Sequence, residues 1–160
     1  MMKRIWIILL LAAVPLMGCQ NDTITLYFPQ GDAGYLVPEE RIIGEDTDME
    51  KAAILALMAG PETEGLSPSI PEGTALLAFR MEGKVAVIDF SEEIRTGHAG
   101  GSTGEMMTIF SIANTMGNLP TVERVQIRIE GREAETLLGH MDISGEIDPN
   151  MDLVKEEQDE

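Results

Sequence analysis

The sequence predicts an α+β fold, with a single small antiparallel or mixed sheet and two helices packed on one of its faces. Two observations predict it. Strand-like and helix-like segments follow one another in the order β, ββ, α, ββ, α, ββ, and one sheet face is the simplest place to bury two amphipathic helices. The chain has 160 residues, 44% of them apolar, which is enough for one domain with a core of its own.

The first strands are predicted at residues 24–28, 35–37 and 41–43. Residues 24–28 read Ile-Thr-Leu-Tyr-Phe, a β-branched and aromatic run typical of a strand, and a Pro-Gln-Gly-Asp turn follows at 29–32. The segments 35–37 and 41–43 flank Pro38. Because proline is confined to sheet edges, we expect them to form two short strands or one edge hairpin.

Two helices are predicted, at about 48–59 and 103–117. Each follows residues with the spacing of a capping box, Thr47 with Glu50 and Ser102 with Glu105. In such a box the hydroxyl caps the helix and the glutamate reaches back to the first residue. Ser102 is therefore the expected N-cap of the second helix. A Gly-Pro pair at 60–61 ends the first helix.

The second half of the chain contains the remaining strands. Residues 74–80 and 84–90 predict an antiparallel hairpin around 81–83. Between 122 and 130 apolar residues alternate with Arg124, Gln126 and Arg128, which predicts one buried and one solvent-facing side. A short last strand is expected at 134–138. We expect the domain to span 24–145, and residues 146–160, which are rich in acids, to form a flexible tail.

The N-terminus has the features of an export signal. Lys3 and Arg4 precede the apolar run 5–17, which has the length of a signal-peptide core and is too short to span a bilayer. The run ends in Leu-Met-Gly-Cys, which resembles the lipobox of bacterial lipoproteins. We therefore predict a signal peptide at 1–18 and a tether at 19–23, with a diacylglycerol lipid on Cys19. The alternative is an ordinary secretory signal followed by an unrelated cysteine.

The charge excludes two classes of partner. There are 28 acids against 11 bases, a net charge of −17, and no basic cluster of the kind that binds nucleic acid or adsorbs to anionic lipid. Aromatic residues make up 4% of the chain, which disfavours stacking of bases or sugars. Contact with a membrane is therefore expected through the lipid on Cys19, and no nucleic acid is expected as a partner.

Several short motifs together resemble the GerMN domain of sporulation and spore germination proteins. They are Leu-Tyr-Phe-Pro at 26–29, Tyr-Leu-Val-Pro at 35–38, Leu-Met-Ala-Gly-Pro at 57–61, Ile-Pro-Glu-Gly-Thr at 70–74 and Val-Ile-Asp-Phe-Ser at 87–91. The resemblance implies a bacterial surface domain, often on a lipoprotein. It also implies a fold similar to the ring-building motif of secretion-system proteins, which stacks side by side into oligomers. The family implies no catalytic residues.

Candidate catalytic groups are few. Gly-Gly-Ser-Thr-Gly at 100–104 fits the nucleophile elbow of serine hydrolases, and His140 with Asp142 or Glu123 would complete a triad around Ser102. The elbow needs a strand that leads directly into a helix, whereas a glycine-rich loop precedes Ser102 here. The helix start could instead hold a phosphate, but the acidic surroundings disfavour an anion.

Metal sites are also disfavoured. His98 and His140 are the only histidines and Cys19 is the only cysteine, which is a poor set for zinc. The acids after residue 141 follow no calcium-loop pattern, and we interpret them as a solvated tail.

We therefore expect a lipid-anchored extracytoplasmic protein that binds protein and is not an enzyme, with no cofactor and no metal. The expected partners are envelope, sporulation or germination proteins, or further copies of the chain. Alternatives are a serine hydrolase that uses Ser102 and a lipoprotein that binds cell-wall or cationic ligands. The expected interaction surface combines the solvent-facing strand side with the loop 97–104, and its residues are Arg124, Gln126, Arg128, His98, Gly101 and Ser102.

Overall fold

The structure is a computed structural model that describes residues 22–31, 33–44, 48–98 and 100–155. Its elements in chain order are β1 (Asp22–Pro29), β2 (Leu36–Ile43), α1 (Met49–Ala59), β3 (Leu76–Glu82), β4 (Val85–Phe90), α2 (Glu93–Thr96), α3 (Ser102–Gly117), β5 (Arg124–Ile129), β6 (Arg132–Glu133) and the 3-10 turn η1 (Met151–Leu153). The predicted α+β class is confirmed. Signal peptide, Cys19 and most of the tether lie outside the described residues.

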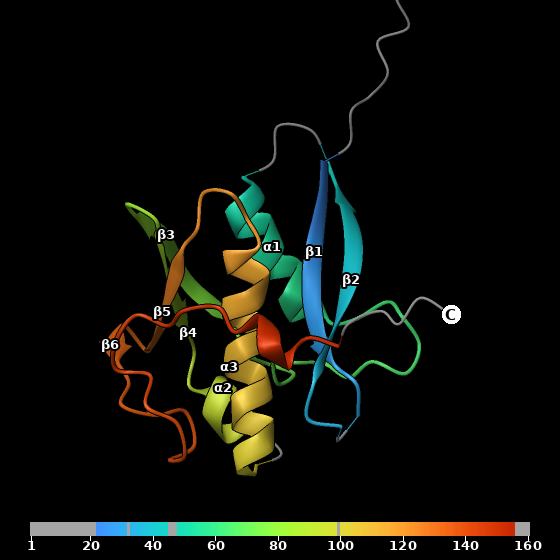
Figure 1. Cartoon of the computed structure of the whole chain (residues 1–160). Helices are drawn as coiled ribbons and strands as arrows, with labels where there is room; N and C mark the ends of the chain where they lie inside the picture. Colours follow the sequence, from blue (N-terminus) through green and yellow to red (C-terminus); the bar gives the residue numbers. More distant parts are fainter. Residues whose placement is uncertain (1–21, 32, 45–47, 99, 156–160) are drawn as a thin grey trace, which may run out of the picture.

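The prediction of a single sheet is wrong, because the described strands form two. β1 and β2 make an antiparallel hairpin, and the other sheet has the order β3-β4-β5-β6. Figure 1 shows α1 and α3 between the two sheets. α3 contacts β1 on one side and β5 on the other, and it also packs against α1. The helices are thus the middle layer and bury apolar side chains toward both sheets.

Among the described strands β1 pairs only with β2, and its other edge is bonded to a helix. The Tyr27 N–H points away from β2 and donates to Thr115 Oγ1 of α3 at 3.0 Å. A hydroxyl thus satisfies a donor that would otherwise need a strand partner. Pro38 lies opposite Tyr27, so its nitrogen also points away from the hairpin ladder and the ladder loses no bond. This is why β2 runs through Pro38 as one strand.

The larger sheet follows the predicted pattern in its centre. β3 and β4 pair antiparallel as expected, with an irregularity between Leu76 and Ala78, and β4 pairs parallel with β5. The predicted alternation of β5 is confirmed, since Val125, Ile127 and Ile129 are buried and the side chains between them face solvent. No described helix is long and apolar enough to cross a membrane.

The prediction of a last strand at 134–138 is wrong. β6 has only two residues, and the chain after it is irregular. The N–H groups of Leu137 and Leu138 donate to the carboxylate of Glu105 in α3, at 3.1 and 2.7 Å. Because their donors go to a side chain, these residues build no strand ladder.

The prediction of a flexible tail is wrong for residues 146–155. Ile147 exchanges two backbone hydrogen bonds with Val125 of β5, at 2.7 and 3.0 Å. Asn150 exchanges two more with the Asn114 side chain of α3, at 2.7 and 2.9 Å. Val154 then forms a parallel bridge with Leu36 at the outer edge of β2. Residues 156–160 lie outside the described part of the chain.

Candidate functional site

A cavity of about 960 Å³ lies at one end of the molecule. Its walls come from the end of β1, the end of α1, the loop 67–72, the loop before α3 and the first turn of α3. In Figure 1 the end of β1 and the start of α3 lie at the lower end, whereas β1 begins at the upper end. We call the cavity-bearing end the pole. His98, Gly101 and Ser102, from the predicted surface, all line this cavity.

His98 fastens the loop before α3. Its Nε2 lies 2.9 Å from Thr108 Oγ1 in α3, and the Thr108 hydroxyl donates to the Ser69 carbonyl oxygen at 2.6 Å. Its Nδ1 accepts the Gly100 N–H at 3.1 Å. One half-buried imidazole thus links the loop before α3, the helix itself and the loop 67–72.

Glycines give the pole its shape. Gly100 and Gly101 have φ angles of +94° and +85°, which side chains rarely adopt. A Cβ on Gly104 would lie 3.1 Å from His98 Cε1, so the imidazole packs closely on the first turn of α3. The predicted capping role of Ser102 is wrong, because Gly101 is the N-cap and no side chain caps this end.

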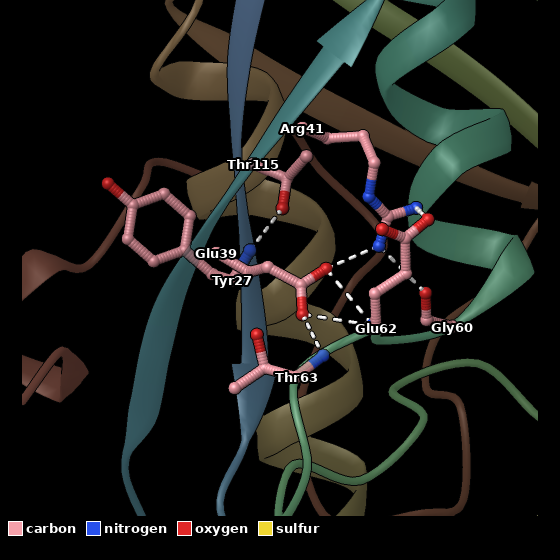
Figure 2. A network of polar contacts seen from close by, with 7 residues as sticks. All are labelled: Tyr27, Glu39, Arg41, Gly60, Glu62, Thr63 and Thr115. Atoms are coloured by element: carbon pink, nitrogen blue, oxygen red, sulfur yellow. Dashed lines mark hydrogen bonds and ion pairs between the residues drawn. The ribbon is translucent and has the colours of Figure 1, made fainter.

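Glu39 holds the loop that leads to the cavity wall (Figure 2). Its carboxylate accepts the Glu62 N–H at 3.0 Å and the Thr63 N–H at 2.7 Å, and it forms an ion pair with Arg41. Arg41 also donates to the Gly60 carbonyl oxygen at 3.2 Å. Burial by itself would raise the pKa of the Glu39 carboxyl, but these hydrogen bonds outweigh it and hold the pKa below its ordinary value.

The carboxylate of Glu105 holds the segment after β6 in the same way, by accepting its backbone N–H groups. Glu105 is fully buried, and its carboxylate accepts the N–H groups of Leu137, Leu138 and His140. The His140 Nδ1 lies 2.8 Å from the same carboxylate. Burial alone would raise the pKa of the Glu105 carboxyl, but the bonds from Leu138 and His140 hold it below the ordinary value. The predicted capping role of Glu105 is therefore wrong.

The hydrolase hypothesis finds no support in the geometry. Ser102 is exposed on the first turn of α3, and neither histidine of the described chain bonds to its hydroxyl. His98 uses both nitrogens on Thr108 and Gly100, and His140 directs Nδ1 to Glu105. Within the described residues, no three His, Cys, Asp or Glu side chains lie together as metal ligands would.

The strand half of the predicted surface lies elsewhere. Arg124, Gln126 and Arg128 project from β5, and none of them lines the cavity. Acids already partner all three. Arg124 pairs with Glu146, and Glu133 lies 3.6 Å from Arg128 and 3.5 Å from Gln126. The structure therefore brings together the loop residues and separates them from the strand residues.

Sequence reasoning missed both buried glutamates. Glu105 lies on the same helical face as Ile109, Ile112 and Met116, all of which are fully buried. An acid at a core position of an apolar helix face signals a buried acceptor. For Glu39 the signal was weaker, because a charged residue in an edge strand is ordinary.

Comparison with known proteins places the chain in a family. A family model described as sporulation and spore germination, Germane, matches residues 25–135. The chain belongs to the Germane family. The GerMN resemblance in the sequence is thereby confirmed. No curated protein matches the chain.

Solved structures of Germane domains share the fold. The first GerMN domain of the sporulation protein GerM from Bacillus subtilis has a TM-score of 0.67 at 22% identity, covering 79% of this chain and 97% of that one. The tandem GerMN domains of the same protein have a TM-score of 0.68 at 21% identity, covering 90% of this chain, which spans about half (51%) of the tandem structure.

A further structure, described as "Putative Lipoprotein from Clostridium perfringens", has a TM-score of 0.58 at 26% identity. The match covers 80% of this chain and 87% of that one. The Germane fold thus occurs on a chain that is described as a lipoprotein.

Proposed function

We propose that this Germane-family protein is an extracytoplasmic lipoprotein that binds an envelope, sporulation or germination protein at its pole. In this proposal Cys19 carries the lipid and has no catalytic role, and the domain is an accessory part of a larger assembly.

The composition of the pole carries the proposal. Among the described residues that line the cavity, only Glu72 bears a formal charge at neutral pH, although the chain as a whole carries −17. The other lining residues are glycines, prolines, hydroxyl residues, His98 and apolar side chains such as Met58, Ile70 and Met107. Depletion of charge marks the centre of protein interfaces, so the pole is the part of this acidic surface best suited to a protein partner.

The position of the pole relative to the tether supports the same conclusion. β1 begins at Asp22, three residues after Cys19, so a lipid there can lie at most about 10 Å along the chain from the domain. The start of β1 and the pole lie at opposite ends of the molecule (Figure 1). A lipid on Cys19 would therefore hold the upper end near the bilayer and leave the pole facing outward.

The lipid and the partner can be tested separately. Palmitate labelling of the full chain in a bacterial host should disappear in Cys19→Ala, and labelling that persists would contradict the anchor. For the partner, a photo-reactive amino acid at Thr103 of the membrane-bound protein should give a protein adduct. The same amino acid at Glu123, an exposed site before β5, is the control and should give less.

A further inference from the structure

The hydrogen bonds around His98 define its protonation state. Thr108 has one hydroxyl proton and gives it to the Ser69 carbonyl oxygen, which cannot donate. The Thr108 oxygen can therefore only accept from His98 Nε2, so Nε2 carries a hydrogen. Nδ1 accepts the Gly100 N–H and must be unprotonated. The geometry fits only the neutral imidazole with its hydrogen on Nε2.

Protonation of this imidazole would break the arrangement. A hydrogen on Nδ1 would face the Gly100 N–H, so a hydrogen bond would become a contact between two donors. The ring also packs against Gly104 in the first turn of α3, where the helix dipole disfavours a positive charge. Gly100 has no side chain that could hold it in place once this bond is lost, whereas the Gly101 carbonyl oxygen still accepts the Glu105 N–H at 3.0 Å.

The charged groups near His98 act in opposite directions. Burial lowers the pKa of the His98 imidazole below its ordinary value, while the negative Glu105 raises it in part. Glu72, on the loop 67–72, lines the same cavity, and Arg95 of α2 is engaged with the Thr136 carbonyl oxygen and Glu92. His140 is the second imidazole beside Glu105, with its Nδ1 2.8 Å from the carboxylate.

We propose that His98 is an acid-sensitive latch, which holds the described residues of the loop before α3 in the cavity wall at neutral pH (the closed loop) and releases Gly100 when the imidazole gains a proton. This inference rests on the proposed function, because it assigns a regulation to the surface that we propose binds the partner. Since the folded pKa of His98 is depressed, the closed loop is fully stabilised above the ordinary value of 6.5 and loses this contribution as the pH falls.

Nuclear magnetic resonance of the full chain in detergent micelles tests the latch. At pH 7.5 the ring spectrum of His98 should show hydrogen on Nε2 and none on Nδ1. Between pH 7.5 and 5.0 the protection factor of the Gly100 amide against hydrogen exchange should fall about five- to tenfold. This is the decrease expected for the loss of one hydrogen bond. The ring titration and the loss of protection should share one midpoint.

Two variants sharpen the test. His98→Asn places an acceptor near the Nδ1 position and does not titrate, so it should remove the pH dependence at Gly100. His140→Gln changes the other histidine and should leave that dependence in place. Hydrogen on Nδ1 at pH 7.5, titration of His98 with unchanged protection at Gly100, or an equal acid response in His98→Asn would each overturn the latch.

The outcome separates the latch from the proposed function. If adducts form at Thr103 but Gly100 keeps its protection after the His98 ring has gained its proton, the latch is wrong and the partner surface stands. If protection is lost as expected but Thr103 gives no adduct, the loop responds to acid and the proposed function is wrong.

Discussion

Glu39 and Glu105 hold irregular segments in the same way and differ in the cation beside them. Each is a buried carboxylate that accepts backbone N–H groups from a loop distant in sequence. Glu39 has the guanidinium of Arg41, which is charged at every accessible pH. Glu105 has the half-exposed imidazole of His140, whose Nδ1 lies 2.8 Å from the carboxylate.

The guanidinium of Arg41 adds a fixed positive charge beside Glu39, whereas the partner of Glu105 is an imidazole. The ion pair of Glu39 and Arg41 fixes the loop that leads to the cavity wall. The pole itself depends on the loop before α3, where the His98 Nδ1 accepts the Gly100 N–H. Mild acid should therefore act on the pole first and leave the Glu39 region unchanged.

The largest effect is expected from Glu105→Gln. The amide of glutamine would face backbone donors that now meet a carboxylate, in a site with no exposure. We expect a loss of about 3 kcal/mol in the free energy of unfolding, measured by urea denaturation. Glu135→Gln, a substitution of an exposed neighbour, is the control. A cost below about 1 kcal/mol for Glu105→Gln would contradict the claim that the Glu105 carboxylate holds the segment after β6.

Glu39→Gln should cost less, about 2 kcal/mol. Arg41 would still donate to the Gly60 carbonyl oxygen and would still have the Glu62 carboxylate 3.4 Å away. Its positive charge would therefore keep an acidic partner. Urea denaturation beside the exposed control Glu40→Gln measures the difference. A cost larger than that of Glu105→Gln would reverse the order given by this comparison.

Acid should remove the stability that both carboxylates supply. Their pKa values are lower in the folded chain than the ordinary 4.5, so the unfolded chain binds more protons as the pH falls. The contribution is complete above the ordinary value and is lost as the pH falls through the folded value. Unfolding free energies from pH 7 to pH 3 should therefore decline less in either glutamine variant than in the parent chain. An identical decline in all three proteins would contradict the lowered pKa values of Glu39 and Glu105.

The smallest effect is expected on the solvent face of β5. Arg124→Gln and Arg128→Gln remove ion pairs with exposed acids, which are worth at most about 1 kcal/mol. Unfolding midpoints should stay near that of the parent chain. A loss comparable with that of Glu39→Gln would show that these pairs stabilise the fold more than their exposure suggests.

Patterns of spacing predicted the regular elements. Alternation located β5, and glycine and proline located the end of α1. What spacing could not show is where a backbone donor finds its acceptor. Glu105 and Thr115 both lie on α3 and bond to segments distant in sequence. The Glu105 bonds occupy donors of 134–138, and the Thr115 bond occupies a donor at the edge of β1.

The site was predictable only in part. The glycine-rich loop at 97–104 stood out by composition, and its residues His98, Gly101 and Ser102 line the cavity. The cavity also needs the loop 67–72 and the end of α1, which only the tertiary fold brings beside it. The packed segment 146–155 was missed because acids dominate its composition, although Ile147 and Val154 supply its contacts.

The most direct test of the central claim is crosslinking from the two ends of the membrane-bound protein. A photo-reactive residue at Thr103 on the pole and one at Glu123 near the other end would be compared in membranes of the native host. The account predicts a protein adduct that is strong from Thr103 and weak from Glu123. Equal adducts from both positions, or adducts from Glu123 alone, would contradict a partner surface at the pole.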